Sequence, residues 1–109
     1  MDRKELDTFY DSLAEQAKEE GKARLNQLLE EAKADGLEFV RRQGELLQKY
    51  LLQLATGEIT RDEFKSYVMD MKTLSLMEIQ RQGVAGQASI QRYLTGLTRA
   101  LIEGLFRLL

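Results

Sequence analysis

No proline interrupts the 109 residues of this chain. Average usage near 5% would place about five prolines in a chain of this length. Because proline breaks the interior of a helix or a central strand, a chain without it can form uninterrupted helices. Strand signals are also missing, since no segment alternates apolar and polar residues and no Asn-Gly or Asp-Gly pair lies between β-branched runs. We therefore predict an all-α fold.

The clearest local signal is a turn between two helices near the middle of the chain. Gly57 follows an apolar run, where the C-terminus of a helix needs a residue that tolerates positive φ. Thr60 and Glu63 have the spacing of a capping box, in which each side chain accepts a hydrogen bond from the other residue's amide. Ile59 and Phe64 occupy the two positions of a hydrophobic staple. The sequence therefore predicts a helix cap formed by Gly57, Thr60 and Glu63.

This turn separates two long segments of helical character. We predict one helix over about residues 3–55, a turn at about 56–60 and a second helix over about 61–108. A short connection makes consecutive helices antiparallel neighbours. The expected architecture is a single helical-hairpin domain, 1–109, with two helices of about 50 residues each, and two such hairpins would pair into a four-helix bundle.

Glycines inside both helices leave an alternative open. Each one weakens a helix interior by up to about 1 kcal/mol relative to alanine. Asp35-Gly36 or the run Gly83 to Gly86 would then break a helix and give three or four shorter ones, or Gly83 to Gly86 would only kink it. Continuous helices are favoured here, because a hairpin that turns near residue 58 places small residues of one helix beside those of the other.

The two ends of the predicted hairpin differ in apolar content. Residues 86–109 contain ten large apolar and four charged side chains, whereas residues 1–24 contain five large apolar and twelve charged ones. A helix that is apolar nearly all round needs more than one neighbour. We therefore expect an interface with another chain through Ile90, Leu94, Leu97, Leu101, Leu105, Phe106 and Leu108.

Three methionines lie close together in the second predicted helix. Met69, Met71 and Met77 share this region with several leucines. Methionine fills irregular gaps in a core, and it also serves adaptable binding surfaces. The first interpretation, core filling, is favoured.

Composition excludes most catalytic and metal chemistry. The chain has no His and no Cys, so zinc sites, haem ligation and Ser-His or Cys-His nucleophiles lack their residues. Paired carboxylates such as Glu30-Glu31 have no histidine to complete a di-iron site. We expect no enzymatic activity, no catalytic residue, no cofactor and no metal.

The balance of charge and the hydropathy of the chain limit the kinds of partner and the location that can be expected. Sixteen basic and eighteen acidic residues give a net charge of −2, which disfavours nucleic acid. The chain shows neither the apolar core of a signal peptide nor an apolar stretch of membrane-spanning length, so the cytoplasm is the expected location.

The expected function is a non-enzymatic assembly or adaptor module that acts through protein–protein interaction, as a homodimer or higher homo-oligomer or with another protein. The alternative is a membrane-surface protein that uses residues 90–109 as an interfacial amphipathic helix.

Overall fold

A computed structural model describes residues 18–107. In this part, the chain forms four α-helices: α2 (Lys18–Ala34), α3 (Glu38–Thr56), α4 (Arg61–Ile79) and α5 (Val84–Leu97). A π-helix, η2 (Thr98–Ile102), continues α5, and a short 3-10 helix, η3 (Leu105–Arg107), follows it. Residues 18–107 contain no strand. The predicted all-α fold is therefore confirmed for them.

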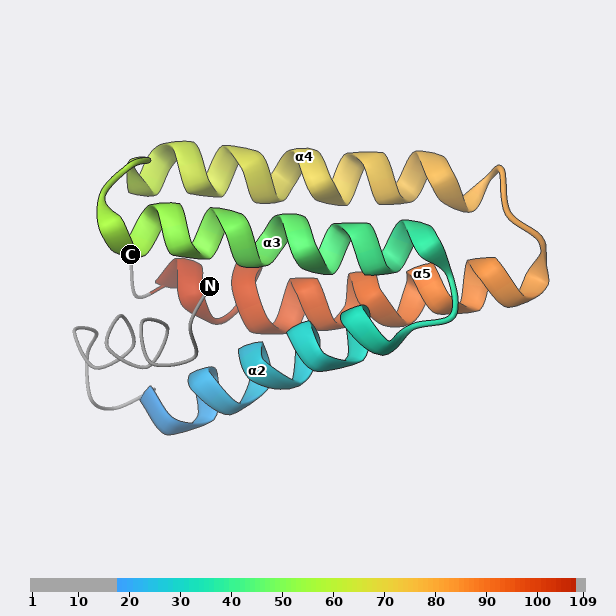
Figure 1. The fold of residues 1–109 in the computed structure, drawn as a ribbon, viewed down its shortest axis with the longest axis horizontal. Helices are drawn as coiled ribbons and strands as arrows, with labels where there is room; N and C mark the ends of the chain where they lie inside the picture. The colour runs from blue at the N-terminus through green and yellow to red at the C-terminus, as the bar shows by residue number, and fades with distance from the viewer. Residues whose placement is uncertain (1–17, 108–109) are drawn as a thin grey trace.

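The four helices form an up-down-up-down bundle within one chain (Figure 1). α3 and α5 each pack against both α2 and α4, whereas α2 and α4 lie on opposite sides of the bundle. All four helices contribute to one continuous apolar core. Its fully buried members include Leu25, Leu47, Leu51, Phe64, Val68, Ile90, Leu97 and Leu101.

The prediction of two continuous helices of about 50 residues is wrong. Within residues 18–107, the first expected helix is interrupted between Ala34 and Glu38 and the second between Ile79 and Val84. The alternative, in which the glycine regions interrupt the helices, is correct. The physical reason is that a hairpin of continuous helices leaves its apolar faces for another chain to cover. Folding each long segment in half lets one chain close its own core.

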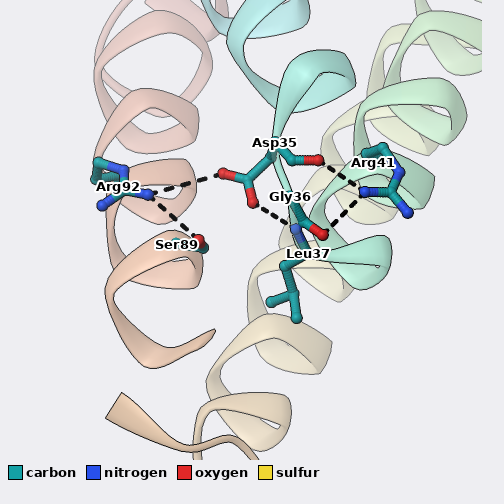
Figure 2. A network of polar contacts seen from close by, with 6 residues as sticks. All are labelled: Asp35, Gly36, Leu37, Arg41, Ser89 and Arg92. Atoms are coloured by element: carbon teal, nitrogen blue, oxygen red, sulfur yellow. Dashed lines mark hydrogen bonds and ion pairs between the residues drawn. The ribbon is translucent and has the colours of Figure 1, made fainter. Parts of the chain in front are cut away.

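Side-chain hydrogen bonds build the α2–α3 corner (Figure 2). The Leu37 N–H donates to Oδ1 of Asp35 at 2.8 Å, an Asx-turn that competes with continuation of the helix. Nη1 of Arg41 donates to the carbonyl oxygens of Asp35 at 2.8 Å and of Gly36 at 2.9 Å. The carbonyls that follow α2 therefore gain partners from the beginning of α3.

The α3–α4 corner has the predicted cap. Gly57 adopts a φ of 79° in the left-handed region, and its N–H donates to the Leu54 carbonyl at 3.2 Å. The Glu63 N–H donates to the Thr60 hydroxyl at 3.1 Å, and the Thr60 N–H donates to the Glu63 carboxylate at 3.0 Å. The predicted capping box is confirmed, together with the role of Gly57.

At the α4–α5 corner, α5 begins after Gly83 without a side-chain cap, although Nε2 of Gln87 donates to the Gln82 carbonyl at 3.0 Å. The Arg81 N–H donates to the Glu78 carbonyl at 3.0 Å, so α4 ends in a tighter turn. Gly83 is extended (φ −72°, ψ −178°), and its carbonyl accepts from the Gln87 N–H at 2.9 Å where α5 begins. The chain is therefore broken before Val84 rather than kinked.

Small residues bring helices close together at two points of the bundle. A Cβ on Gly44 would lie 2.8 Å from the Cβ of Ala32, so α2 and α3 approach there only because residue 44 has no side chain. A Cβ on Gly96 would lie 2.8 Å from Cδ1 of Leu28. Gly96 therefore permits the corresponding approach between α2 and α5.

Candidate functional site

The predicted C-terminal interface lies mainly inside the core of the chain itself. The members that are at most 2% exposed are Ile90, Leu97, Leu101 and Leu105. Leu94 and Phe106 are partly buried and pack against the same core, and Leu108 lies outside the described residues. The reason for expecting a second chain here is wrong, because α5 packs against α2, α3 and α4 of its own chain rather than against one long helix.

The π-helix η2 helps to bury the apolar side chains at the C-terminal end of α5 and just beyond it. The Glu103 N–H donates to the Thr98 carbonyl at 2.8 Å, a step of five residues. Leu97, Leu101 and Leu105 are spaced by four, and such a row drifts by about 40° per step around a regular α-helix. The wider turn of η2 counters this drift, so all three side chains reach the core.

The large apolar side chains left exposed gather on α4 and at the beginning of α5. Within residues 18–107 they are Met69, Leu74, Leu76, Met77 and Val84, with exposed fractions from 43% to 87%. Met71, by contrast, is buried. Core filling is therefore the right interpretation for Met71 and the wrong one for Met69 and Met77.

A polar network joins the α2–α3 corner to α5 (Figure 2). Nη2 of Arg92 donates to the Ser89 hydroxyl at 3.2 Å and lies 3.9 Å from Oδ2 of Asp35. The Asp35 side chain is 12% exposed and that of Arg92 is 70% exposed. Asp35 thus contacts both the backbone at Leu37, just before α3, and Arg92 of α5, while most of the Arg92 side chain remains accessible to solvent.

Two buried polar atoms lack a hydrogen-bond partner among the described residues: the Tyr93 hydroxyl and Oε1 of Gln43. Burial raises the pKa of the Tyr93 phenol far above its ordinary value, because a phenolate is poorly solvated in an apolar core. Ser75, which is also buried, donates to the Met71 carbonyl at 2.8 Å. Tyr93 therefore stays protonated at neutral pH and holds an unpaired hydroxyl inside the bundle.

The described residues contain neither a metal-binding cluster nor a membrane-spanning helix, and the chain matches no known protein. Nowhere in residues 18–107 do three or more His, Cys, Asp or Glu side chains group in a way that could hold a metal ion. None of the helices described here has the length and apolarity needed to span a membrane. Comparison of the chain with protein families, curated proteins and solved structures finds no match. The exposed apolar side chains of α4 are thus the feature from which a function can be argued.

Proposed function

We propose that this chain is a non-enzymatic assembly module that self-associates through the outer face of α4. This outer face consists of Met69, Leu76 and Met77. Leu74 is also exposed but lies on the other flank of α4, since a step of two residues from Leu76 rotates by about 200° around the helix, and exposed Val84 follows the α4–α5 corner. The supporting observation is that every large apolar side chain that residues 18–107 leave exposed comes from α4 or, in the case of Val84, from the first residue of α5. Exposed apolar residues that are grouped, rather than scattered singly, mark interaction sites.

The geometry of α4 separates two apolar stripes. Phe64, Val68 and Met71 face the core at spacings of four and three residues. Met69 and Leu76 lie seven residues apart and therefore on one side of the helix, away from that buried stripe. Leu76 and Met77 are adjacent in sequence and widen the exposed surface around the second half of α4. The two methionines give this surface adaptable side chains that can repack against a partner.

Charge favours a second copy as the partner. α4 begins with Asp62 and Glu63, and Arg81 follows its other end, held only at 3.9 Å by Glu78. In an antiparallel pair of α4 helices, the acidic beginning of one helix lies beside Arg81 of the other copy. In an antiparallel pair, the positive end of each helix dipole also lies beside the negative end of the other, which is favourable. A two-fold symmetric pair of this kind is the commonest form of homo-oligomer.

The test is the molar mass in solution across a concentration series, measured by sedimentation or light scattering. We expect a monomer–dimer equilibrium for the wild-type chain. Leu76→Lys combined with Met77→Lys should give a monomer at every concentration, because an apolar interface cannot bury unpaired charges cheaply. The matched control is Gln27→Lys, at an exposed position of α2, which should leave the equilibrium unchanged.

The same measurements can contradict the proposal. A wild-type chain that stays monomeric throughout the series is incompatible with self-association. If this monomer also sediments with anionic vesicles and the Lys variants do not, the membrane-surface alternative is favoured instead. The lipid contact would then use α4 and not residues 90–109, since Ile90, Leu97 and Leu101 are enclosed in the bundle.

A further inference from the structure

The three methionines of α4 differ in their access to solvent. Met77 is 61% exposed and Met69 is 43% exposed, whereas Met71 is 1% exposed and belongs to the apolar core. Met69 and Met77 are eight residues apart, which places them about 12 Å from each other along the helix. A reagent in solution therefore has direct access to two of these three side chains.

The sulfur chemistry of this chain is limited to thioethers. The chain has four methionines and no cysteine, so no thiol competes for an oxidant and no disulfide can form. The susceptibility of a sulfur atom to oxidation follows its exposure. Within residues 18–107, Met69 and Met77 are therefore the sulfur atoms that an oxidant should reach first, and both belong to the outer face of α4.

We propose that Met69 and Met77 form an oxidation site at which a peroxide switches off the self-association of the chain. The inference rests on the proposed function, since oxidation acts on the face through which two copies would pair. In the reaction, a sulfur lone pair attacks one oxygen of hydrogen peroxide, the O–O bond breaks and an S–O bond forms. The sulfur loses two electrons, the peroxide is reduced, and the second oxygen leaves as water with both hydrogens.

A methionine sulfoxide is poorly suited to an apolar interface. Oxidation converts a flexible apolar side chain into a polar one whose oxygen accepts hydrogen bonds. Thr73 lies four residues from both methionines, but its hydroxyl donates to the Met69 carbonyl at 3.1 Å. Burying a sulfoxide without a hydrogen-bond donor is unfavourable. Each copy contributes both methionines, so a symmetric pair of α4 helices would enclose four such groups.

The burial of Met71 allows the response to be selective. Oxidation of Met71 would place an oxygen atom in the core beside Phe64 and Val68, its companions on the buried side of α4. Oxidation of Met69 and Met77 leaves the core unchanged, because neither side chain belongs to it. The oxidised chain should therefore separate into folded monomers.

Treatment of the dilute wild-type chain with hydrogen peroxide, followed by peptide mass spectrometry, tests the selectivity. Trypsin cleaves after Lys72, so it separates Met77 from Met69 and Met71, and fragmentation distinguishes the latter two. We expect Met69 and Met77 to be oxidised at least about five-fold faster than Met71. Oxidation of Met77 should slow at higher protein concentration, since pairing covers the outer face.

The molar mass in solution then tests the switch. We expect oxidation to raise the Kd of self-association by about ten-fold or more, with unchanged helical circular dichroism. Methionine sulfoxide reductases specific for the two sulfoxide epimers, supplied with a dithiol that donates two electrons per sulfoxide, should restore the original Kd.

Two variants assign the effect to the exposed methionines. The chain with Met69→Leu and Met77→Leu keeps an apolar outer face, so it should self-associate and should keep its Kd after the same treatment. Met71→Leu is the matched control on the buried side of α4. It retains both exposed methionines and should respond to peroxide as the wild-type chain does.

The mass measured before peroxide separates the failure of this inference from that of the proposed function. A chain that is monomeric at every concentration before treatment overturns self-association and the switch together. A dimer that keeps its Kd once Met69 and Met77 are fully oxidised overturns the switch alone. An equal response to peroxide in the variant with leucine at both positions would place the effect elsewhere and would also overturn it. Oxidation of Met71 as fast as that of Met77 would remove the selectivity.

Discussion

α5 and α4 use their apolar side chains in opposite ways. α5 and η2 belong to the most apolar part of the chain, yet Ile90, Leu97 and Leu101 are completely buried. α4 contains more charged residues, yet Leu76 and Met77 are 50% and 61% exposed. The difference lies in the neighbours. α5 packs against three of the described helices, α2, α3 and α4, whereas α4 packs mainly against α3 and α5, with Phe64 also in edge-to-face contact with Phe106 of η3. Apolar content alone therefore does not identify the surface that is free to bind a partner.

The sharpest test of this contrast removes one apolar side chain from each helix region. Leu101→Ala should lower the free energy of unfolding by about 2–5 kcal/mol, because it leaves a cavity in the core. Met77→Ala should change it by less than about 0.5 kcal/mol in the monomer. Urea unfolding of dilute protein measures both values. Comparable losses in the two variants would mean that α4 and α5 do not differ in burial as described.

The second test asks how tightly the bundle is closed on the side of α2. Gly44→Ala should lower the free energy of unfolding by about 1–2 kcal/mol, since the overpacking against Ala32 exceeds the gain in helix propensity. Gly36→Ala is the control, because a Cβ there meets nothing within 4 Å. Thermal unfolding of the two variants measures the difference. A stabilised Gly44→Ala variant would indicate that α2 and α3 are not in close contact at this point.

The third test concerns what holds α4 in place despite its limited burial. Thr60→Ala should lower the free energy of unfolding by about 1 kcal/mol through loss of the cap. Thr73→Ala is a suitable control, since Thr73 is also exposed on α4 and only donates to the Met69 carbonyl. Denaturant titration measures both. An unchanged midpoint for Thr60→Ala would show that the capping box contributes nothing to stability.

The smallest expected effect has the opposite sign. Tyr93→Phe removes a buried hydroxyl that has no hydrogen-bond partner among the described residues, so the free energy of unfolding should rise by about 0.5–1 kcal/mol. Denaturant titration at pH 7 measures the gain. A loss of more than about 1 kcal/mol would instead mean that the hydroxyl makes a stabilising hydrogen bond.

The pH dependence of Tyr93 gives a second measurement on the same variant. The unfolded chain deprotonates this phenol near its ordinary pKa of about 10, whereas burial raises the pKa in the folded state. The folded state therefore retains the proton when the unfolded state loses it, and stability falls as the pH rises above 10. Tyr93→Phe should show a shallower fall over this range.

The parts of the fold that the sequence predicts correctly depend on nearby residues. The cap at Gly57, Thr60 and Glu63 closes within a few residues, so local spacing is sufficient to find it. The α2–α3 corner is different, because Asp35-Gly36 signals a turn only weakly. Whether the helix ends there also depends on the hydrogen bonds from Arg41 to the carbonyls of Asp35 and Gly36. It depends further on core contacts between residues that are far apart in the sequence.

The surface proposed to bind was not identified from the sequence for a related reason. Met69, Met71 and Met77 share one region, and only the rotation of α4 against α3 and α5 decides that Met71 is buried and the other two are exposed. The predicted interface at Leu97 and Leu101 was inferred by comparing two segments of a hairpin. In such a hairpin this segment faces one long helix, whereas in the structure α2, α3 and α4 are three separate neighbours of α5. A short apolar helix can be identified from sequence, but the number of helices that surround it cannot.

The π-helix η2 also bears on how this chain can change length. A π turn holds one residue more than the α turn that would replace it. Deleting a residue within Thr98–Ile102 can therefore be accommodated by conversion to regular α-helix. The same deletion within α5 would rotate every later side chain by about 100° relative to the earlier ones and move the core-facing residues away from the core. η2 is thus the place in the second half of the bundle where a gain or loss of one residue disturbs the fold least.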